Sequence, residues 1–175
     1  MSHASYPSAV LSATPPLRHI ASMSAAIATR LIELPDLDAT QALAAQVAAL
    51  VHAGDAILLE GELGAGKTAF ARAFLRAASR DPALEVPSPT FTLVQDYATP
   101  SGTVHHFDLW RLDGPGGMTE LGWDEARDDV VLVEWPDRLG QLRPIDALTV
   151  ALHITGQASR RAVLSGWPDR LGRIA

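Results

Sequence analysis

Cysteine is absent from the 175 residues of this chain, which excludes disulfides, thiolate metal sites and a cysteine nucleophile. We expect a cytoplasmic protein, since a reducing setting is compatible with this absence. No apolar run approaches the roughly 18 to 20 residues that a membrane helix requires, so a membrane span is not expected. The formal net charge of −6 argues against nucleic-acid binding through an overall positive field, because such binding depends on clustered lysine and arginine.

Acidic residues are absent from the first 30 positions, which carry Ser, Ala, Pro and two arginines. This composition superficially resembles an organelle transit peptide. The alternatives are a disordered tail and an upstream start codon used in place of Met23. We expect residues 1–28 to be a disordered N-terminal tail. Residues 29–175 are expected to form a single domain, because 47% hydrophobic content suffices for one core of ordinary size.

Lysine is nearly absent: 13 of the 14 basic residues are arginine, and the exception is Lys67. Lys67 lies in "GELGAGKT" at positions 61–68, which follows the pattern G-x-x-x-x-G-K-[ST]. The glycines of this pattern let backbone N–H groups face phosphates, and the helix that follows adds partial positive charge. We predict that Lys67 reaches the β- and γ-phosphates of ATP and that Thr68 ligates Mg²⁺. The predicted nucleotide-binding residues of this loop are Glu62, Leu63, Gly64, Ala65, Gly66, Lys67, Thr68 and Ala69.

Strand and helix patterns alternate around this loop. Residues 38–54 predict a helix capped by Asp38 or Thr40 and closed by Gly54, and residues 56–61 predict a strand buried on both faces. The other predicted elements are a helix at 67–80, a short helix at 118–129, and strands at 31–34, 87–97, 103–112, 130–135, 146–154 and 160–167. They predict an α/β fold: a three-layer, P-loop NTPase-like domain with a mixed, largely parallel central sheet.

The strand "VVLVEW" at 130–135 ends on an acid, Glu134. A phosphate loop needs a carboxylate at the end of a neighbouring strand to hold Mg²⁺ or its waters. We therefore predict that Glu134 and Thr68 are the metal-associated residues. Trp135 follows directly, and its indole either packs on the nucleotide or covers the core.

Two further segments carry candidate residues. In "VPSPTF" the prolines hold Ser88 and Thr90 extended before a strand, where their hydroxyls can sense a γ-phosphate as switch loops do; ordinary turn chemistry is the alternative.

In "HHFDLWR", strand alternation places His106 and Asp108 on one face. They are a weak candidate for a metal pair. We favour Asp108 as a carboxylate near Mg²⁺ or the attacking water, and His106 as a supporting residue.

Several classes of phosphate-loop protein can be compared with the residues present. Asparagine is absent, which excludes the Asn-Lys-x-Asp motif of GTPases. A small-molecule kinase stays an alternative because the chain has a suitable length for one. Its candidate phosphate-binding arginines, Arg111, Arg138 and Arg143, are however scattered along the sequence. A nucleotide-gated binding module, in which hydrolysis is incidental, also stays open. Without an evident arginine finger, hydrolysis by the chain alone is expected to be slow.

The blocks "GELGAGKT", "SPTFTLVQDY", "HHFDLWRL" and "LVEWPDRL", in this order, resemble the TsaE family of bacterial ATPases, formerly called YjeE. The resemblance covers about residues 29–155. It implies an accessory ATPase that works with the TsaD and TsaB proteins, and indirectly with tRNA, in making threonylcarbamoyladenosine next to the anticodon. It also implies that ATP hydrolysis with Mg²⁺ resets the complex between rounds.

When the family's motif is matched position by position, the resemblance implies that Lys67 contacts phosphate and Thr68 contacts Mg²⁺. It also implies that Glu134 is a second Mg²⁺-associated acid. It places 88–90 in a switch-like segment and makes Asp108 the acid of the "HFDLYR" block, so that Lys67, Asp108 and Glu134 form the predicted catalytic set. Trp110 replaces the tyrosine of that block, which removes any role of its hydroxyl. Two features have no assigned role. They are the adjacent Arg160 and Arg161, read as a solvated strand end with contact to tRNA as the open alternative, and the second copy of "WPDRLG" at 167–172, expected to be dispensable.

Overall fold

A computed structural model of the protein describes residues 28–175. Its seven strands form one sheet in the order β1-β7-β6-β2-β5-β4-β3. The strands are β1 (Thr29–Leu34), β2 (Ala56–Glu60), β3 (Val94–Thr99), β4 (Gly102–Asp108), β5 (Val130–Glu134), β6 (Leu148–Ile154) and β7 (Arg160–Ser165). The four central strands β6, β2, β5 and β4 are parallel, and the outer pairings are antiparallel. The expected mixed, largely parallel sheet is confirmed. The predicted tail lies almost wholly outside the described residues.

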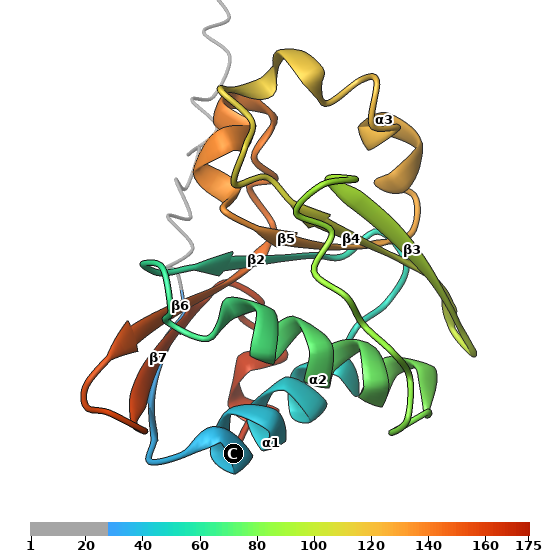
Figure 1. The fold of residues 1–175 in the computed structure, drawn as a ribbon. Coiled ribbons are helices and arrows are strands. Elements are labelled where there is room, and N and C mark those ends of the chain that lie inside the picture. The colour runs from blue at the N-terminus through green and yellow to red at the C-terminus, as the bar shows by residue number, and fades with distance from the viewer. Residues whose placement is uncertain (1–27) are drawn as a thin grey trace, which may run out of the picture.

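Helices cover both faces of the sheet (Figure 1). On one face lie α1 (Leu37–Ala48) and α2 (Lys67–Ser79), and on the other lie α3 (Trp123–Ala126) and the 3₁₀ segments at Pro115–Gly117 and Pro136–Leu142. The residues of β2 and β5 alternate between two buried clusters, one on each face. This double burial explains why both strands read as unbroken apolar runs.

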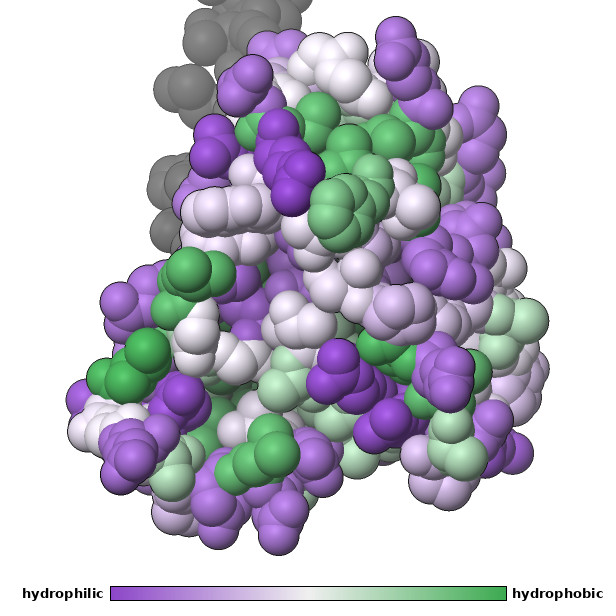
Figure 2. All heavy atoms as spheres, in the orientation of Figure 1, coloured by the Kyte–Doolittle hydropathy of each residue, from purple (hydrophilic) through white to green (hydrophobic). Residues whose placement is uncertain are grey.

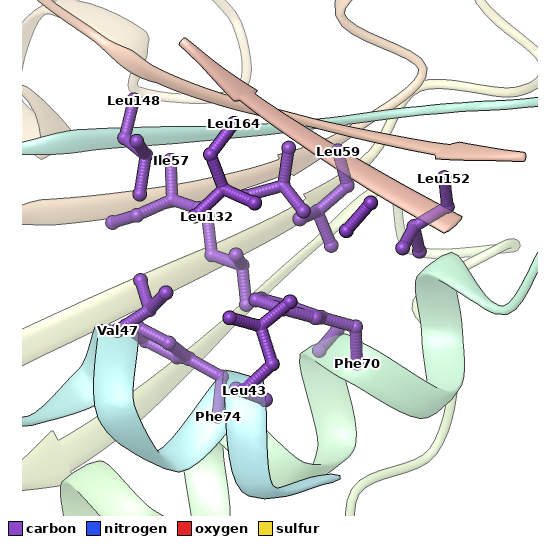
Figure 3. Close-up of a cluster of buried hydrophobic side chains, with 14 of the residues drawn as sticks. Leu43, Val47, Ile57, Leu59, Phe70, Phe74, Leu132, Leu148, Leu152 and Leu164 are labelled. Atoms are coloured by element: carbon purple, nitrogen blue, oxygen red, sulfur yellow. The ribbon is translucent and has the colours of Figure 1, made fainter. Parts of the chain in front are cut away.

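The larger core lies between the sheet and the pair α1 and α2 (Figure 3). Leu43 and Val47 of α1, and Phe70 and Phe74 of α2, point toward the sheet residues Ile57, Leu59 and Leu132. All seven are at most 2% exposed. Fully burying one such side chain is worth about 1.5 to 3 kcal/mol, so this layer fixes α2, and with it the glycine loop, against β2.

The first helix differs from the prediction at both ends. Its N-cap is Asp36, whose carboxylate accepts a hydrogen bond from the Ala39 N–H at 2.8 Å, so Asp38 and Thr40 are not the cap. The helix ends at Ala48 rather than at Gly54. Gly54, with φ of +85°, closes the turn that leads into β2 instead, because a glycine adopts this left-handed conformation without strain.

Other predicted elements are shorter than expected, and the strand predicted over 103–112 ends at Asp108. The strand predicted from 87 begins at Val94, because residues 87–93 form a loop that ends at Leu93 with φ of +65°. The helix predicted over 118–129 is reduced to α3, which begins after Gly122 with φ of +72°. Both left-handed residues interrupt the repeating dihedrals that a regular strand or helix requires.

The two copies of "WPDRLG" begin with the same turn, in which the arginine N–H donates to the tryptophan carbonyl at 3.1 and 2.9 Å. Each begins with a tryptophan in the left-handed region, Trp135 at φ +61° and Trp167 at +43°. In the second copy, Trp167 and Leu171 are buried in the larger core, and Arg170 donates two hydrogen bonds to the Asp55 carboxylate at 2.6 and 2.8 Å. The copy closes the core and ties the chain end to the start of β2, which argues against the expectation that it is dispensable.

The surface seen in the orientation of Figure 1 carries hydrophobic residues in several separate patches among polar ones (Figure 2). Over residues 28–175, no helix has the length and apolar character that crossing a membrane demands.

Candidate functional site

The glycine loop joins β2 to the first turn of α2. Gly64 and Gly66 have φ of +81° and +106°, a region that residues with a Cβ rarely adopt. At Gly61 an added Cβ would lie 2.5 Å from the carbonyl oxygen of Leu152, so only glycine lets the loop start this close to β6. The loop therefore has the backbone form that can turn N–H groups toward an anion at the start of a helix.

Lys67 is folded into its own loop. Its Nζ donates hydrogen bonds to the carbonyl oxygens of Gly61 at 2.7 Å and Glu62 at 2.9 Å, and it lies 3.7 Å from the ring centroid of Trp135. Burial lowers the pKa of Lys67 from its ordinary value of 10.5, and the carboxylates of Glu134, Asp108 and Glu62 oppose that shift. The acids around the loop thus favour the charged ammonium that a phosphate would need.

Glu134 lies at the end of β5 and is 2% exposed. Its Oε2 accepts a hydrogen bond from the Thr68 hydroxyl at 2.9 Å, and its Oε1 lies 3.1 Å from Nε2 of His106. The two metal-associated residues predicted from the sequence therefore touch. The weak pairing of His106 with Asp108 is not formed, because the His106 ring faces Glu134 instead.

Asp108 ends β4 and lies opposite Glu134 in the parallel pairing of β4 with β5. Its Oδ2 accepts hydrogen bonds from the hydroxyls of Ser88 at 2.9 Å and Thr90 at 3.0 Å, and its Oδ1 accepts one from the Trp110 backbone N–H at 3.3 Å. Segment 87–93 is thereby fastened to the end of β4. A change at Asp108 would be transmitted directly to these two hydroxyls.

These side chains line a cleft of about 340 Å³. Its lining residues are Leu63, Gly64, Gly66, Lys67, Thr68, Ala69, Ser88, Thr90, Asp108, Trp110, Glu134 and Trp135. Of the predicted site residues, Glu62 and Ala65 are missing from the lining: Ala65 is buried, and Glu62 contributes its carbonyl to Lys67. Trp110 also lines the cleft although it was not among the predicted site residues, and its ring centroid lies 4.7 Å from that of Trp135.

A larger hollow, of about 730 Å³, lies on another part of the molecule. Its two arginines are already engaged, Arg143 by Glu60 and Thr149, and Arg170 by Asp55. The kinds of side chain that a phosphate site needs, a lysine, a threonine and two acids, lie together in the smaller cleft.

The expectation of a solvated strand end holds for Arg161 but not for Arg160. Arg160 is no solvated strand end: its Nε donates to the carbonyl of Ala65 at 3.1 Å and its Nη2 to that of Gly64 at 3.2 Å. Its neighbour Arg161 pairs with Glu33 on the exposed face of β1. The contact of Arg160 spans 96 residues of sequence, and no local pattern announces it.

The residues present fit Mg²⁺ and a nucleotide phosphate. Mg²⁺ prefers oxygen ligands, usually one or two protein side chains together with phosphate oxygens and waters. The Thr68 hydroxyl and the Glu134 carboxylate are oxygen donors 2.9 Å apart on the wall of the cleft, next to the first turn of α2.

The sheet order, the loop between β2 and α2, and the acid at the end of β5 define a P-loop NTPase-like fold. Residues 34–163 match the family described as threonylcarbamoyl adenosine biosynthesis protein TsaE, and the chain belongs to this family. The resemblance found in the sequence blocks is thereby confirmed.

Relatives and a solved structure agree with this assignment. The chain is 35% identical over 122 residues to the tRNA threonylcarbamoyladenosine biosynthesis protein TsaE of Rickettsia felis, covering 69% of this chain and 71% of the relative. It is 34% identical over 123 residues to the protein of the same name from Bacillus subtilis, covering 69% and 75%. The crystal structure of YdiB from Bacillus subtilis superposes with a TM-score of 0.68 at 26% identity, covering 86% of this chain and 94% of that one.

Proposed function

We propose that this chain is a cytoplasmic ATPase of tRNA threonylcarbamoyladenosine biosynthesis. It binds ATP with Mg²⁺ on the glycine loop at 61–68 and hydrolyses it to drive turnover of a complex of TsaD and TsaB, reaching tRNA through that complex. The names of its relatives support the pathway, and the cleft supports the activity.

The observation that carries the proposal is the 2.9 Å hydrogen bond between Thr68 and Glu134. It joins the residue after the loop lysine to an acid at the end of the neighbouring parallel strand. That juxtaposition is the one in which P-loop ATPases hold Mg²⁺.

The polar residues of the cleft divide the proposed reaction among them. Lys67 and the N–H groups of the loop bind the phosphates, and bound Mg²⁺ supplies charge neutralisation. Thr68 and Glu134 hold the metal site, while Asp108 orients water and holds Ser88 and Thr90. The segment 87–91 then reports the state of the γ-phosphate to a partner protein.

A partner is needed because the cleft is short of positive charge. Within residues 28–175, Lys67 is the one basic side chain among those that line it. An arginine supplied from outside commonly raises hydrolysis by about 10³ to 10⁵. Slow turnover alone and faster turnover with TsaD and TsaB are the expected behaviour.

The test is ATP hydrolysis by the purified chain, alone and with TsaD and TsaB, beside the Glu134→Gln variant. Turnover that rises on mixing and is lost in the variant supports the proposal. ADP release only when a phosphate acceptor is added would favour a small-molecule kinase. ATP binding without turnover, together with cellular function of the variant, would favour a nucleotide-gated binding module.

A further inference from the structure

His106 is fully buried on β4 and contacts the site through one atom. Its Nε2 lies 3.1 Å from Oε1 of Glu134, and its Nδ1 has no hydrogen-bond partner among residues 28–175. A buried polar ring that satisfies one nitrogen on a carboxylate and leaves the other unpaired costs stability that an apolar side chain would not. The contact with Glu134 therefore requires an explanation beyond packing.

The register of the sheet brings the two residues together. In the pairing of β4 with β5, His106 lies opposite Leu132 and Asp108 lies opposite Glu134. His106 thus reaches diagonally to the acid two positions further on, a distance within reach of long side chains on neighbouring strands. Asp108, which lies directly opposite, turns its carboxylate to Ser88 and Thr90 instead.

The hydrogen bond fixes the tautomer of the ring. A carboxylate only accepts hydrogen bonds, so the proton of His106 must lie on Nε2. Nδ1 has no hydrogen-bond partner among residues 28–175. His106 therefore contacts the site as an Nε2–H donor aimed at one oxygen of Glu134.

We propose that His106 is the positioning residue of Glu134. By holding Oε1, it leaves Oε2 directed at Thr68 and prevents the buried carboxylate from rotating away from the metal site. The inference rests on the proposed function, since it assigns His106 a part in that same site. Partners of this kind orient metal-associated carboxylates, and their loss typically costs about 10- to 100-fold in metal affinity or activity.

The decisive variants are a matched pair of amides. His106→Gln can place its amide nitrogen near the position of Nε2, whereas the shorter His106→Asn cannot reach Glu134 and keeps the same polarity and charge. We expect the glutamine variant to retain kcat for ATP hydrolysis in the presence of TsaD and TsaB. The asparagine variant should lose about 10- to 100-fold in kcat and need more Mg²⁺, with a similar unfolding midpoint. Equal activity of the two variants would overturn the proposal.

A second measurement does not depend on hydrolysis. In wild-type protein labelled with ¹⁵N-histidine, His106, assigned through the glutamine variant, should show the Nε2–H tautomer with a slowly exchanging proton. The Nδ1–H tautomer would overturn the inference even if the chain is an active ATPase. Conversely, a wild-type chain that hydrolyses no ATP but shows the Nε2–H tautomer would refute the proposed function while supporting the placement of His106 on Glu134.

Discussion

Thr68 and Glu134 are 66 positions apart in the chain, and their side chains share a hydrogen bond of 2.9 Å. One opens α2 and the other closes β5, so the bond exists only because β2 and β5 are neighbours in the sheet. Both residues line the cleft, and the pair is the first target for substitution.

Thr68→Ala should remove Mg²⁺-dependent ATP affinity, because it deletes the hydroxyl that faces both the cleft and Glu134. We expect a loss of about 10- to 100-fold in apparent Mg²⁺ affinity. Thr68→Ser keeps the hydroxyl and should stay within about threefold of wild type. Calorimetric titration of ATP with and without Mg²⁺ measures both, and equal affinities for the two variants would show that the hydroxyl has no part in the site.

Lys67→Ala should abolish ATP binding and leave the fold intact. Burial lowers the pKa of Lys67, so its ammonium carries a desolvation cost that the variant no longer has. Lys67→Arg should not restore binding, since a planar guanidinium does not fit the loop. Nucleotide binding and thermal unfolding of the three proteins test this. A bound nucleotide in the alanine variant, or a large fall in its melting temperature, would contradict it.

Tyr97→Phe should change the pH dependence of stability. Burial raises the pKa of Tyr97 above its ordinary value of 10.0, with Arg72 opposing the shift, and its hydroxyl has no hydrogen-bond partner among the described residues. The native state therefore keeps this proton where the unfolded state has lost it, and the free energy of unfolding falls as pH rises above about 10.

The phenylalanine variant lacks this titration and should gain stability relative to wild type at high pH. Urea unfolding at about pH 8 and about pH 10.5 measures the difference. At the lower pH the variant should be at least as stable as wild type, because it loses an unsatisfied buried hydroxyl. A constant difference between the two proteins at both pH values would show that Tyr97 is not the titrating group.

Arg170→Ala should destabilise the fold although it lies far from the cleft. Arg170 binds Asp55 through two hydrogen bonds and lies 3.8 Å from the ring centroid of Trp167. With side-chain exposures of 21% and 15%, losing this pair should cost about 1 to 3 kcal/mol.

The matched control is Arg161→Ala, which breaks the exposed pair with Glu33 and should cost less than about 1 kcal/mol. Urea unfolding of the two variants and wild type gives the comparison. Equal destabilisation by the two substitutions would mean that the second copy of "WPDRLG" does not anchor the chain end.

Much of the fold was predictable because its signals are local. The apolar runs of β2 and β5 and the helix after the glycine loop each lie within a single element, and the structure confirms them. Element ends were less predictable. The cap at Asp36 and the left-handed turns at Leu93 and Gly122 depend on single dihedral angles, which composition and spacing do not encode.

The candidate site also has a part that was predictable from local sequence and a part that was not. Its loop, from Gly61 to Thr68, is one contiguous motif, and Gly64 and Gly66 have positive φ angles that glycine adopts without strain. Arg160 on the loop carbonyls and Trp110 beside Trp135 could not be inferred, since nothing in their local sequence says which element they meet.

By itself, the sequence determined an α/β fold around a glycine loop, and membership in the TsaE family. Both follow from short-range patterns in which hydrophobic period, turn residues and motif spacing agree. The tertiary structure alone decided that Glu134 meets His106, and that Asp108 holds Ser88 and Thr90. These contacts depend on the order of β2, β5 and β4, which is set by how the whole sheet packs against its helices rather than by any one segment.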